Sequence, residues 1–573
     1  MAMVQQDYDN FCNDLLSKTM QYIDTSKIKC YNIDKKTIQS DDPIYRSAAA
    51  SKAPISLVYT PPGSGKSALI KERALTLKNA GTPAHKICIL NMNVSKVKEM
   101  QRSLPDMTVM TFNDFTFGLF HENFPAIKMS NMDTINNILR LGNVKNKAEL
   151  DKVPEEIKEK FMTYLSMHDQ QGKNVLLFLF INQHLNDVLS LINATERTDY
   201  ALASMITYNL LYTFKKNPYN FDSIIINGIH NMPLQVFCSI LEYVNRYGVN
   251  LFLTGSTGET IYEFNMAYSD IMNDLSSYPD KIDVIRMTRS IISNDVANVL
   301  NMNPYARNMD HIFSRNAIVP NDDMLYDTIK TCIDPDNTSY ITDIFNTHQK
   351  LLVVARSKMD IACIKTAMEH LYFDKFPNLK TVDLTSIQSP KYVGGRMLSI
   401  YHEGLENRYP RGITVKQLGY ELYEAMTNVI YDLESDYVKL QYQTNRDMLP
   451  SFLKNPIFGD IDKMWNVSDL IETFILAEEQ LQNDYAKDIK QTVINFTNVD
   501  LIYSTIHSAI DIRCDNALIL FKNATENVDQ NMYRSALSRA NKSEFIIFCN
   551  KRKFEIELQK YLNVINPKNS KNI

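Results

Sequence analysis

Glycine, tryptophan and paired cysteines are scarce in this chain of 573 residues, which contains 16 Gly, 8 Cys and a single Trp. The cysteines are scattered without any C-x-x-C spacing, which excludes a sequence-encoded zinc site and a disulfide framework and favours a reducing compartment. Where glycine is this rare, a local cluster of glycines indicates a place where the backbone must adopt an unusual conformation or approach a ligand closely.

Long apolar runs and an excess of basic residues are also missing. The longest lipid-like run, Val175 to Ile181, is far too short to span a bilayer, and the N-terminus lacks a charged-then-apolar signal pattern. We therefore expect no membrane partner and a cytoplasmic or nuclear location. The net charge of -5 confines any nucleic-acid binding to a local groove. The many Asn, Ile, Lys, Tyr and Met residues are typical of AT-rich coding sequences, such as those of viral and parasitic genomes.

The stretch from Ser56 to Leu69, SLVYTPPGSGKSAL, is the clearest functional pattern. A short apolar run, two prolines, Gly-Ser-Gly and then Lys-Ser predict a strand, a phosphate loop and a helix. The loop backbone can wrap a polyphosphate, Lys66 can reach the terminal phosphates, and the Ser67 hydroxyl can ligate Mg²⁺. Thr60 replaces the first glycine of the full pattern, so a polar turn before an ordinary helix is the alternative. The loop residues expected to bind nucleotide are Pro62, Gly63, Ser64, Gly65, Lys66 and Ser67.

Strand and helix signals alternate along the chain, as expected for parallel sheets covered on both faces. A first sheet is predicted from apolar runs after Lys86, Thr108, Phe221 and Val249. A second sheet is predicted from the segments 350–364, 381–387, 500–509, 517–521 and 543–550. We assign residues 1–50 to an N-terminal helical segment, 51–117 and 201–284 to the first sheet domain, 118–200 to a helical insertion, 285–387 and 496–573 to the second sheet domain, and 388–495 to a second helical insertion.

Seven short motifs occur in an order that resembles superfamily 1 helicases of the UvrD/Rep type, from about residue 44 to 550. They are TPPGSGKS, LNMNVSKVKEM, TFNDF, LTGSTGETIYEFNMA, MTRS, STIHSA and YRSALSRANK. The resemblance implies an α/β fold of two RecA-like parallel-sheet domains, each with a helical insertion, and ATP with Mg²⁺ in the cleft between them. It also implies association with single-stranded nucleic acid, DNA in this family, and coupling of hydrolysis to strand separation.

The same resemblance assigns roles to single residues. Arg289 and Arg539 take positions that contact the γ-phosphate, and Tyr45 stands where the family has an adenine-contacting Gln. The residues that the resemblance places at nucleic acid are Thr111, Tyr262, Phe264, Thr505 and His507.

The chain departs from the family where hydrolysis should occur. The family's strand ends in Asp-Glu, which holds Mg²⁺ and activates water, whereas this chain has Asn227 and Gly228 there. Asn is a weak neutral ligand for Mg²⁺, and Gly accepts no proton. Because a general base typically contributes a factor of about 10²–10⁴ in rate, we expect ATP binding to remain and turnover to fall. Ser67 and Asn227 are the remaining candidate metal ligands.

Two features have competing interpretations. Glu259 replaces the family's γ-phosphate-sensing Gln, and it is either a product of drift or a partial substitute for the missing catalytic carboxylate. Tyr262 and Phe264 alternate along a stretch that we expect to be extended, which suits base stacking worth about 1–3 kcal/mol per ring but also an ordinary core.

Three functions stay open at this point. The first is a helicase-fold protein that binds ATP and single-stranded nucleic acid, with DNA-stimulated phosphate release abolished by Lys66→Ala if it is active. The second is a catalytically inactive pseudo-helicase that serves as a structural subunit of a replication or transcription complex and binds Mg·ATP without such release. The third is a scaffold that binds a protein partner through residues 388–495, with neither nucleotide binding nor release.

Overall fold

The computed structural model describes residues 5–35, 38, 40, 42–61, 63–167, 170–256, 259–287, 289–290, 303–304, 312–317, 325–385, 393–432, 436–491, 499–509, 512–522, 532, 535–537 and 539–549. The chain forms two compact units. One unit, the sheet unit, comprises Met3–Phe115, Tyr219–Ile387 and Val493–Ile573, and the other, the helical unit, comprises Met1–Ala2, Thr116–Pro218 and Gln388–Thr492. Both large sheets, each six-stranded and entirely parallel, lie in the sheet unit, so the predicted α/β class is confirmed.

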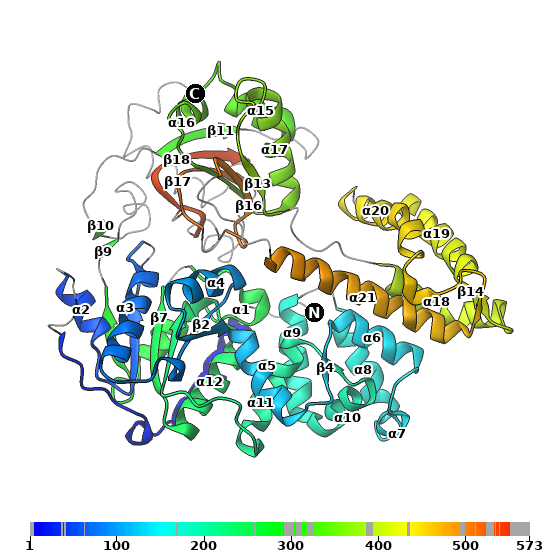
Figure 1. Cartoon of the computed structure of the whole chain (residues 1–573), viewed down its shortest axis with the longest axis horizontal. Coiled ribbons are helices and arrows are strands. Elements are labelled where there is room, and N and C mark those ends of the chain that lie inside the picture. The colour runs from blue at the N-terminus through cyan, green and yellow to red at the C-terminus, as the bar shows by residue number, and fades with distance from the viewer. Residues whose placement is uncertain are drawn as a thin grey trace. The chain divides into compact units, whose positions relative to one another are not determined.

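The first sheet, of which Figure 1 labels β2 and β7, has the strand order β3-β2-β6-β7-β1-β8. Its register brings Tyr59 beside Gly255 and Asn227 beside Thr254, so the carboxyl ends of its central strands lie at one edge. The strands are β1 (Ile55–Tyr59), β2 (Ile87–Asn91), β3 (Thr108–Thr111), β6 (Ser223–Asn227), β7 (Asn250–Gly255) and β8 (Asp283–Arg286).

Helices α3 (Lys66–Asn79) and α4 (Val94–Ser103) pack on one face of this sheet. Their apolar side chains form a core with alternate strand residues, because successive side chains of a strand point to opposite faces. That core includes Leu69, Ile70 and Met100 from the helices and Val58, Ile89, Val109, Ile225 and Phe252 from the strands.

The N-terminal segment packs on the first sheet domain, as its apolar spacing predicts. Helix α1 (Gln5–Gln21) buries Leu16 and Met20 and lies against α12 (Leu234–Tyr247). The Tyr8 hydroxyl donates a hydrogen bond to the carbonyl oxygen of Ala267 at 2.9 Å. A short helix, α2 (Pro43–Ala49), follows before β1.

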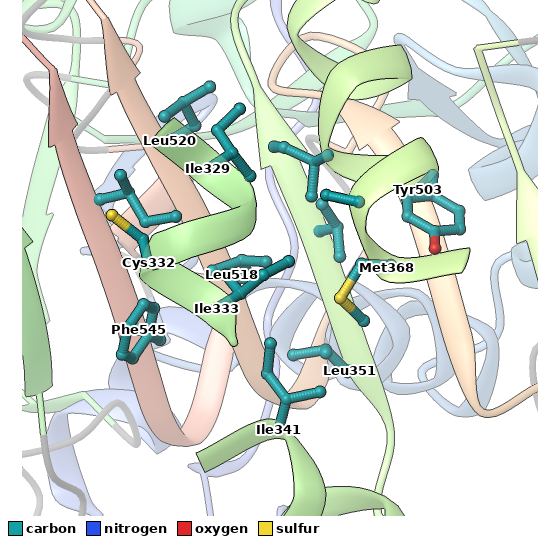
Figure 2. Packing of buried hydrophobic residues seen from close by; sticks show 14 of the residues in the cluster. Ile329, Cys332, Ile333, Ile341, Leu351, Met368, Tyr503, Leu518, Leu520 and Phe545 are labelled. Carbon is teal, nitrogen blue, oxygen red and sulfur yellow. The ribbon is translucent and has the colours of Figure 1, made fainter. Parts of the chain in front are cut away.

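The second sheet has the order β11-β18-β17-β12-β16-β13. Figure 2 shows side chains of three helices lying between those helices and the strands, in a core that includes Ile333, Ile341, Met368, Leu518 and Phe545. The helices are α15 (Leu325–Ile333), α16 (Tyr340–Asn346) and α17 (Lys358–Tyr372), and the strands are β11 (Ile312–Ala317), β12 (Leu351–Ala355), β13 (Thr381–Asp383), β16 (Leu501–Thr505), β17 (Cys514–Lys522) and β18 (Ala540–Cys549).

Strand β11 is the member of this sheet that the sequence did not predict. It pairs with β18 at the sheet edge, and its sequence, IFSRNA, is half polar, which hides it from a search for apolar runs. Residues 291–302, which follow Arg289 and Ser290, lie outside the described residues, and so does the C-terminal segment NPKNSKNI.

The helical unit joins the two predicted insertions. Arg197 pairs with Glu479 at 2.9 Å between Nη1 and Oε2, and the Ser399 hydroxyl donates to Oδ1 of Asn137 at 2.9 Å. Because both contacts connect residues 116–218 to residues 388–492, the insertions form one body. Its helices are α6 (Met132–Leu141), α7 (Lys147–Leu150), α8 (Glu155–Leu165), α9 (Gln170–Gln183), α10 (Leu185–Thr195), α11 (Tyr200–Leu210), α18 (Gly394–Arg408), α19 (Val415–Asp432), α20 (Asp436–Phe452) and α21 (Val467–Gln491), with α5 (Phe112–Asn123) entering it from the sheet unit.

Two expectations about the insertions need correction. The predicted boundary at residue 200 lies too early, since α11 belongs to the helical unit. Residues 388–495 carry no strand signal in the sequence and were assigned to a helical insertion, yet β14 (Ile413–Thr414) pairs with β15 (Met464–Trp465). The first insertion has a similar short pair, β4 (Lys128–Met129) with β5 (Arg197–Thr198).

No single helix in the described ranges is both long and apolar enough to cross a membrane. One bent pair, Gly172–Gln183 with Leu185–Thr195, meets the length and composition criteria together, with a bend of 106° between its halves.

Candidate functional site

The phosphate loop connects the carboxyl end of β1 to the first turn of α3. Gly63 and Gly65 have φ values of 76° and 85°, in the left-handed region that glycine adopts without strain. Gly65 is also the N-cap of α3, and a Cβ on it would meet no atom within 4 Å. The first N–H groups of a helix have no intrahelical acceptor, so this open space faces a ready set of backbone donors. A phosphate group fits such a cradle.

Thr60 has a structural role that explains the missing first glycine. Its backbone N–H and its hydroxyl both donate to the carbonyl oxygen of Gly255, at 2.7 and 2.9 Å, and its side chain is fully buried. These bonds join the start of the loop to the end of β7. Ser64 donates its backbone N–H to Pro61, while its buried hydroxyl finds no hydrogen-bond partner among the described residues. Hydrogen bonds from Thr60 thus fix the start of the loop, and the Ser64 hydroxyl within the loop has no partner among the described residues.

Glu259 lies between two cations. Its Oε2 is 4.0 Å from Nζ of Lys66, and its Oε1 is 3.5 Å from Nη2 of Arg539. The guanidinium of Arg539 is held by Ser535, with Nε donating to the carbonyl oxygen at 2.7 Å and Nη2 to the hydroxyl at 2.9 Å. All three charged groups are largely buried, with side-chain exposures of 22% for Lys66, 8% for Glu259 and 7% for Arg539.

The charges of this cluster are fixed by their surroundings. Burial raises the pKa of Glu259, but the neighbouring cations Lys66 and Arg539 outweigh it and hold the pKa below its usual range, so the carboxylate is ionised at neutral pH. Burial, followed by repulsion from Lys66, lowers the pKa of His230 to about 3. The Nδ1 atom of neutral His230 accepts a hydrogen bond from the backbone N–H of Ser256 at 3.1 Å. His230 therefore holds the loop after β7 and is a poor proton acceptor.

Asn227, where a catalytic carboxylate was expected from the resemblance, belongs to an amide pair. Nδ2 of Asn227, the last residue of β6, donates to Oδ1 of Asn91, the last residue of β2, at 2.8 Å. The next residue, Gly228, has a φ of 80° and donates its N–H to the carbonyl oxygen of Thr254. Asp222 precedes β6 and pairs with Lys29 at 2.9 Å, so it does not replace the missing acids.

A metal ion would find few protein ligands here. In the part of the chain that the structure describes, no group of three or more His, Cys, Asp or Glu side chains is arranged to hold a metal ion. Mg²⁺ bound with a nucleotide takes most of its ligands from phosphate and water. Ser67, the second residue of α3, and Asn227 both lie at the carboxyl edge of the first sheet, with β7 between their strands.

Tyr262, Phe264 and His507 come together as an aromatic cluster. Each ring centroid lies 5.6 Å from the other two, and the His507 ring stands edge-on to both tyrosine and phenylalanine. The Tyr262 hydroxyl donates to the carbonyl oxygen of His507 at 3.1 Å, and Nε2 of His507 lies 3.2 Å from the carbonyl oxygen of Ile261. Phe264 is 41% exposed. We expected this stretch to be extended, and that expectation was wrong, because residues Glu263–Asn265 form a 3₁₀ turn.

The two threonines predicted at nucleic acid have local hydrogen-bond partners. The Thr111 hydroxyl donates to Oδ2 of Asp114 at 2.7 Å and accepts from its N–H at 3.0 Å, which caps the start of α5. The Thr505 hydroxyl donates to the hydroxyl of Ser508 at 3.1 Å and accepts from its N–H at 3.3 Å. Both threonines are buried, at 7% and 8% exposure, whereas Phe264 is exposed.

The remaining predicted residues are placed as follows. Tyr45 lies on α2, half-buried against the core beneath α3, where burial and then the charge of Glu72 raise its pKa to about 12. The backbone of Arg289 belongs to a short strand, β9 (Arg289–Ser290), paired with β10 (Asn303–Pro304), and its side chain lies outside the described residues. Pro62 lies outside them too.

Several residues of this region were not found by sequence reasoning. Asn91 and Ser256 act through hydrogen bonds to Asn227 and His230, which are 136 and 26 residues away in the chain. Arg286, the last residue of β8, places its guanidinium 3.9 Å from the centroid of the Tyr59 ring. The sequence carries no local signal for these pairings, because each depends on strand order.

The chain matches no family model, and a search of curated proteins finds no significant relative.

Proposed function

We propose that this protein binds ATP with Mg²⁺ at the phosphate loop, between two RecA-like sheet domains, and that it associates with single-stranded nucleic acid. The observation that carries this proposal is the meeting of Lys66 and Arg539 on one carboxylate, that of Glu259. Lys66 begins the helix that follows β1 of the first sheet, Arg539 directly precedes β18 of the second sheet, and both were expected at the terminal phosphates of a nucleotide. A lysine at a helix start and an arginine from a second domain are cations that suit the phosphates of a nucleotide.

The proposed mechanism uses each group according to its chemistry. The α3 N-terminus, with Gly65 and the Ser64 hydroxyl, binds the phosphates, while Lys66 and Arg539 neutralise their charge. ATP supplies the driving free energy when it is bound and cleaved. With an Asn227–Asn91 amide pair in place of a general base, this chain binds nucleotide but cleaves it slowly or not at all.

The aromatic cluster supports the nucleic-acid part of the proposal. Phe264 exposes a ring face large enough for a base to stack on, and Tyr262 and His507 hold it from behind. The hydroxyls of Thr111 and Thr505 already have local hydrogen-bond partners, so in this proposal the two residues only help to position the backbone near the nucleic acid.

A second candidate function is a catalytically inactive pseudo-helicase acting as a subunit of a replication or transcription complex. Besides the amide pair, it is favoured by exposed tyrosines on α19: Tyr420, Tyr423 and Tyr431 are 63%, 44% and 82% exposed. Their spacing of three and eight residues brings them close to one helix face. Exposed aromatic residues are enriched where proteins bind other proteins.

Calorimetric titration with Mg·ATP, alongside phosphate release with and without single-stranded DNA, tests the proposal. Wild type should bind Mg·ATP saturably, and Lys66→Ala should abolish that binding. Gly65→Ala should also abolish it, because its Cβ fills the open space at the loop. Gly81→Ala is the matched control, since Gly81 also has a positive φ of 95° with open space around its Cβ but lies at the far end of α3.

The outcomes separate the candidates. Each glycine variant should lose about 1–2 kcal/mol of stability to backbone strain, so a difference in ATP binding between them reports on the loop alone. Equal ATP binding by wild type, Gly65→Ala and Gly81→Ala would contradict the nucleotide site. Binding without DNA-stimulated release indicates the inactive function.

A further inference from the structure

We propose that Glu259 makes this site select nucleoside diphosphates over triphosphates, by placing a fixed negative charge where the γ-phosphate would lie. The inference rests on the proposed nucleotide site and concerns which nucleotide it holds. The carboxylate of Glu259 contacts the two cations expected to receive that phosphate, one with each of its oxygens.

Geometry makes the carboxylate a substitute for a terminal phosphate. A γ-phosphate offers oxygens to a lysine and an arginine at once, and Glu259 does the same from within the chain, at 4.0 Å from Nζ of Lys66 and 3.5 Å from Nη2 of Arg539. Arg539 is further held by Ser535, so the cation is already in place without a ligand. An arriving γ-phosphate must displace the carboxylate or lie against it.

The neighbouring groups do not relieve this repulsion. Lys66 and Arg539 keep the pKa of Glu259 low in spite of its burial, so the carboxylate stays ionised. His230, the other titratable group of the cluster, is neutral because burial and the charge of Lys66 lower its pKa to about 3. At neutral pH the negative Glu259 carboxylate therefore lies between the two cations that a γ-phosphate would need.

A diphosphate avoids the conflict. Its two phosphates would lie at the α3 N-terminus, whose first turn carries no acidic residue, and would end short of Nζ of Lys66, where the Glu259 carboxylate lies. One full charge at about 4–5 Å in a partly buried site changes affinity by roughly ten- to a hundredfold. Buried charges are also screened less by salt than surface charges. The discrimination should therefore persist at physiological ionic strength.

The test compares ATP and ADP binding by calorimetry, with and without Mg²⁺, for wild type and Glu259→Gln. Wild type should bind ADP at least as tightly as ATP. Glu259→Gln should tighten ATP binding by about tenfold or more and change ADP binding by less than about twofold. The change should be larger without Mg²⁺, because the metal ion masks phosphate charge. ADP binding also reports that the variant is folded.

Glu99→Gln is the matched control. Glu99 bridges two lysines in the same manner, with Oε2 2.7 Å from Nζ of Lys96 and Oε1 3.4 Å from Nζ of Lys71, but none of the three belongs to the nucleotide site. This variant should leave both affinities unchanged.

Three results would overturn the inference. An unchanged ratio of ATP to ADP affinity in Glu259→Gln contradicts it directly. Weaker Mg·ATP binding in that variant, with metal-free ATP unaffected, shows instead that Glu259 ligates Mg²⁺. If neither wild type nor Glu259→Gln binds ADP or ATP, the nucleotide site itself fails, and the inference fails with it.

Discussion

The side-chain amide of Asn227 donates a hydrogen bond to Oδ1 of Asn91 across two adjacent strands, at 2.8 Å. The amide nitrogen of Asn91 is itself buried and finds no hydrogen-bond partner in the described residues. Reversing the Asn91 amide would present that nitrogen to position 227. The pair can therefore accept a carboxylate at this position, as a hydrogen-bond acceptor, with the Asn91 oxygen taking the unpaired place that its nitrogen now holds, so the number of unpaired buried atoms does not rise.

Asn227→Asp should strengthen metal binding and raise ATP turnover. A carboxylate at the end of β6 is a far better Mg²⁺ ligand than an amide, and Asn91 can donate to it after its amide reverses. We expect tighter Mg²⁺-dependent ATP binding by about tenfold, with a smaller gain in phosphate release because Gly228 still provides no base. Metal titration of the ATP complex and single-turnover phosphate release measure both effects.

Asn91→Ala in the same background supplies the control for that prediction. It removes the expected donor to the introduced carboxylate and should cancel part of the gain. Mg²⁺ affinity that is equal in wild type and Asn227→Asp would show that the metal ion does not approach the end of β6.

Phe264→Ala should weaken binding of single-stranded DNA. The ring is 41% exposed beside Tyr262 and His507, and the loss of one stacking face costs about 1–3 kcal/mol of binding free energy. Tyr247→Ala is the comparison, because Tyr247 is 38% exposed but lies at the end of α12 that leads to the amino end of β7, away from the site. Fluorescence anisotropy with labelled oligonucleotides measures the affinities, and an equal loss in both variants would argue against the aromatic cluster.

Stability should fall as the pH rises because of Glu242. Burial raises its pKa from an ordinary 4.5 to about 8, and its Oε2 lacks a hydrogen-bond partner among the described residues. Between those two pH values the folded protein holds a proton that the unfolded chain has lost, so the contribution of this group is complete below pH 4.5 and is lost as the pH rises through about 8.

Glu242→Gln should remove that pH dependence. The variant stays neutral, so we expect it to be more stable than wild type by about 1–3 kcal/mol at pH 9 and nearly equal to it at pH 4. Urea denaturation at both pH values, followed by fluorescence of the sheet unit's tyrosines, gives the comparison. The same pH profile in both proteins would show that Glu242 is hydrated when charged.

The apolar strands were predictable from the sequence because a parallel strand buried on both faces is a continuous apolar run. ISLVY, ICILN and LLVVA are such runs, and each forms a strand. Strand β11 was not predictable in this way, because a strand at the edge of a sheet needs no continuous apolar run. Its half-polar sequence suggests a loop unless β18 is known to lie beside it.

The candidate site was predicted unevenly for a related reason. The phosphate loop is a contiguous segment, so its pattern was visible in the sequence. The Glu259–Arg539 contact and the Asn227–Asn91 pair join residues distant in sequence, and no local pattern encodes them. Likewise, the union of the two insertions depends on the packing of α6 against α18 and α21 and on polar contacts such as Arg197 with Glu479, all between segments distant in sequence.

The turn from Glu259 to Tyr262 joins two sites within one tetrapeptide. Glu259 contacts Lys66, the carbonyl oxygen of Ile261 lies against His507, and the Tyr262 hydroxyl reaches His507 again. Three residues span at most about 10 Å, so the Glu259 carboxylate and the aromatic ring of Tyr262 are carried by one short piece of backbone. In the proposed function, the terminal phosphate of a nucleotide and a stacked base would therefore meet the two ends of the same four-residue segment.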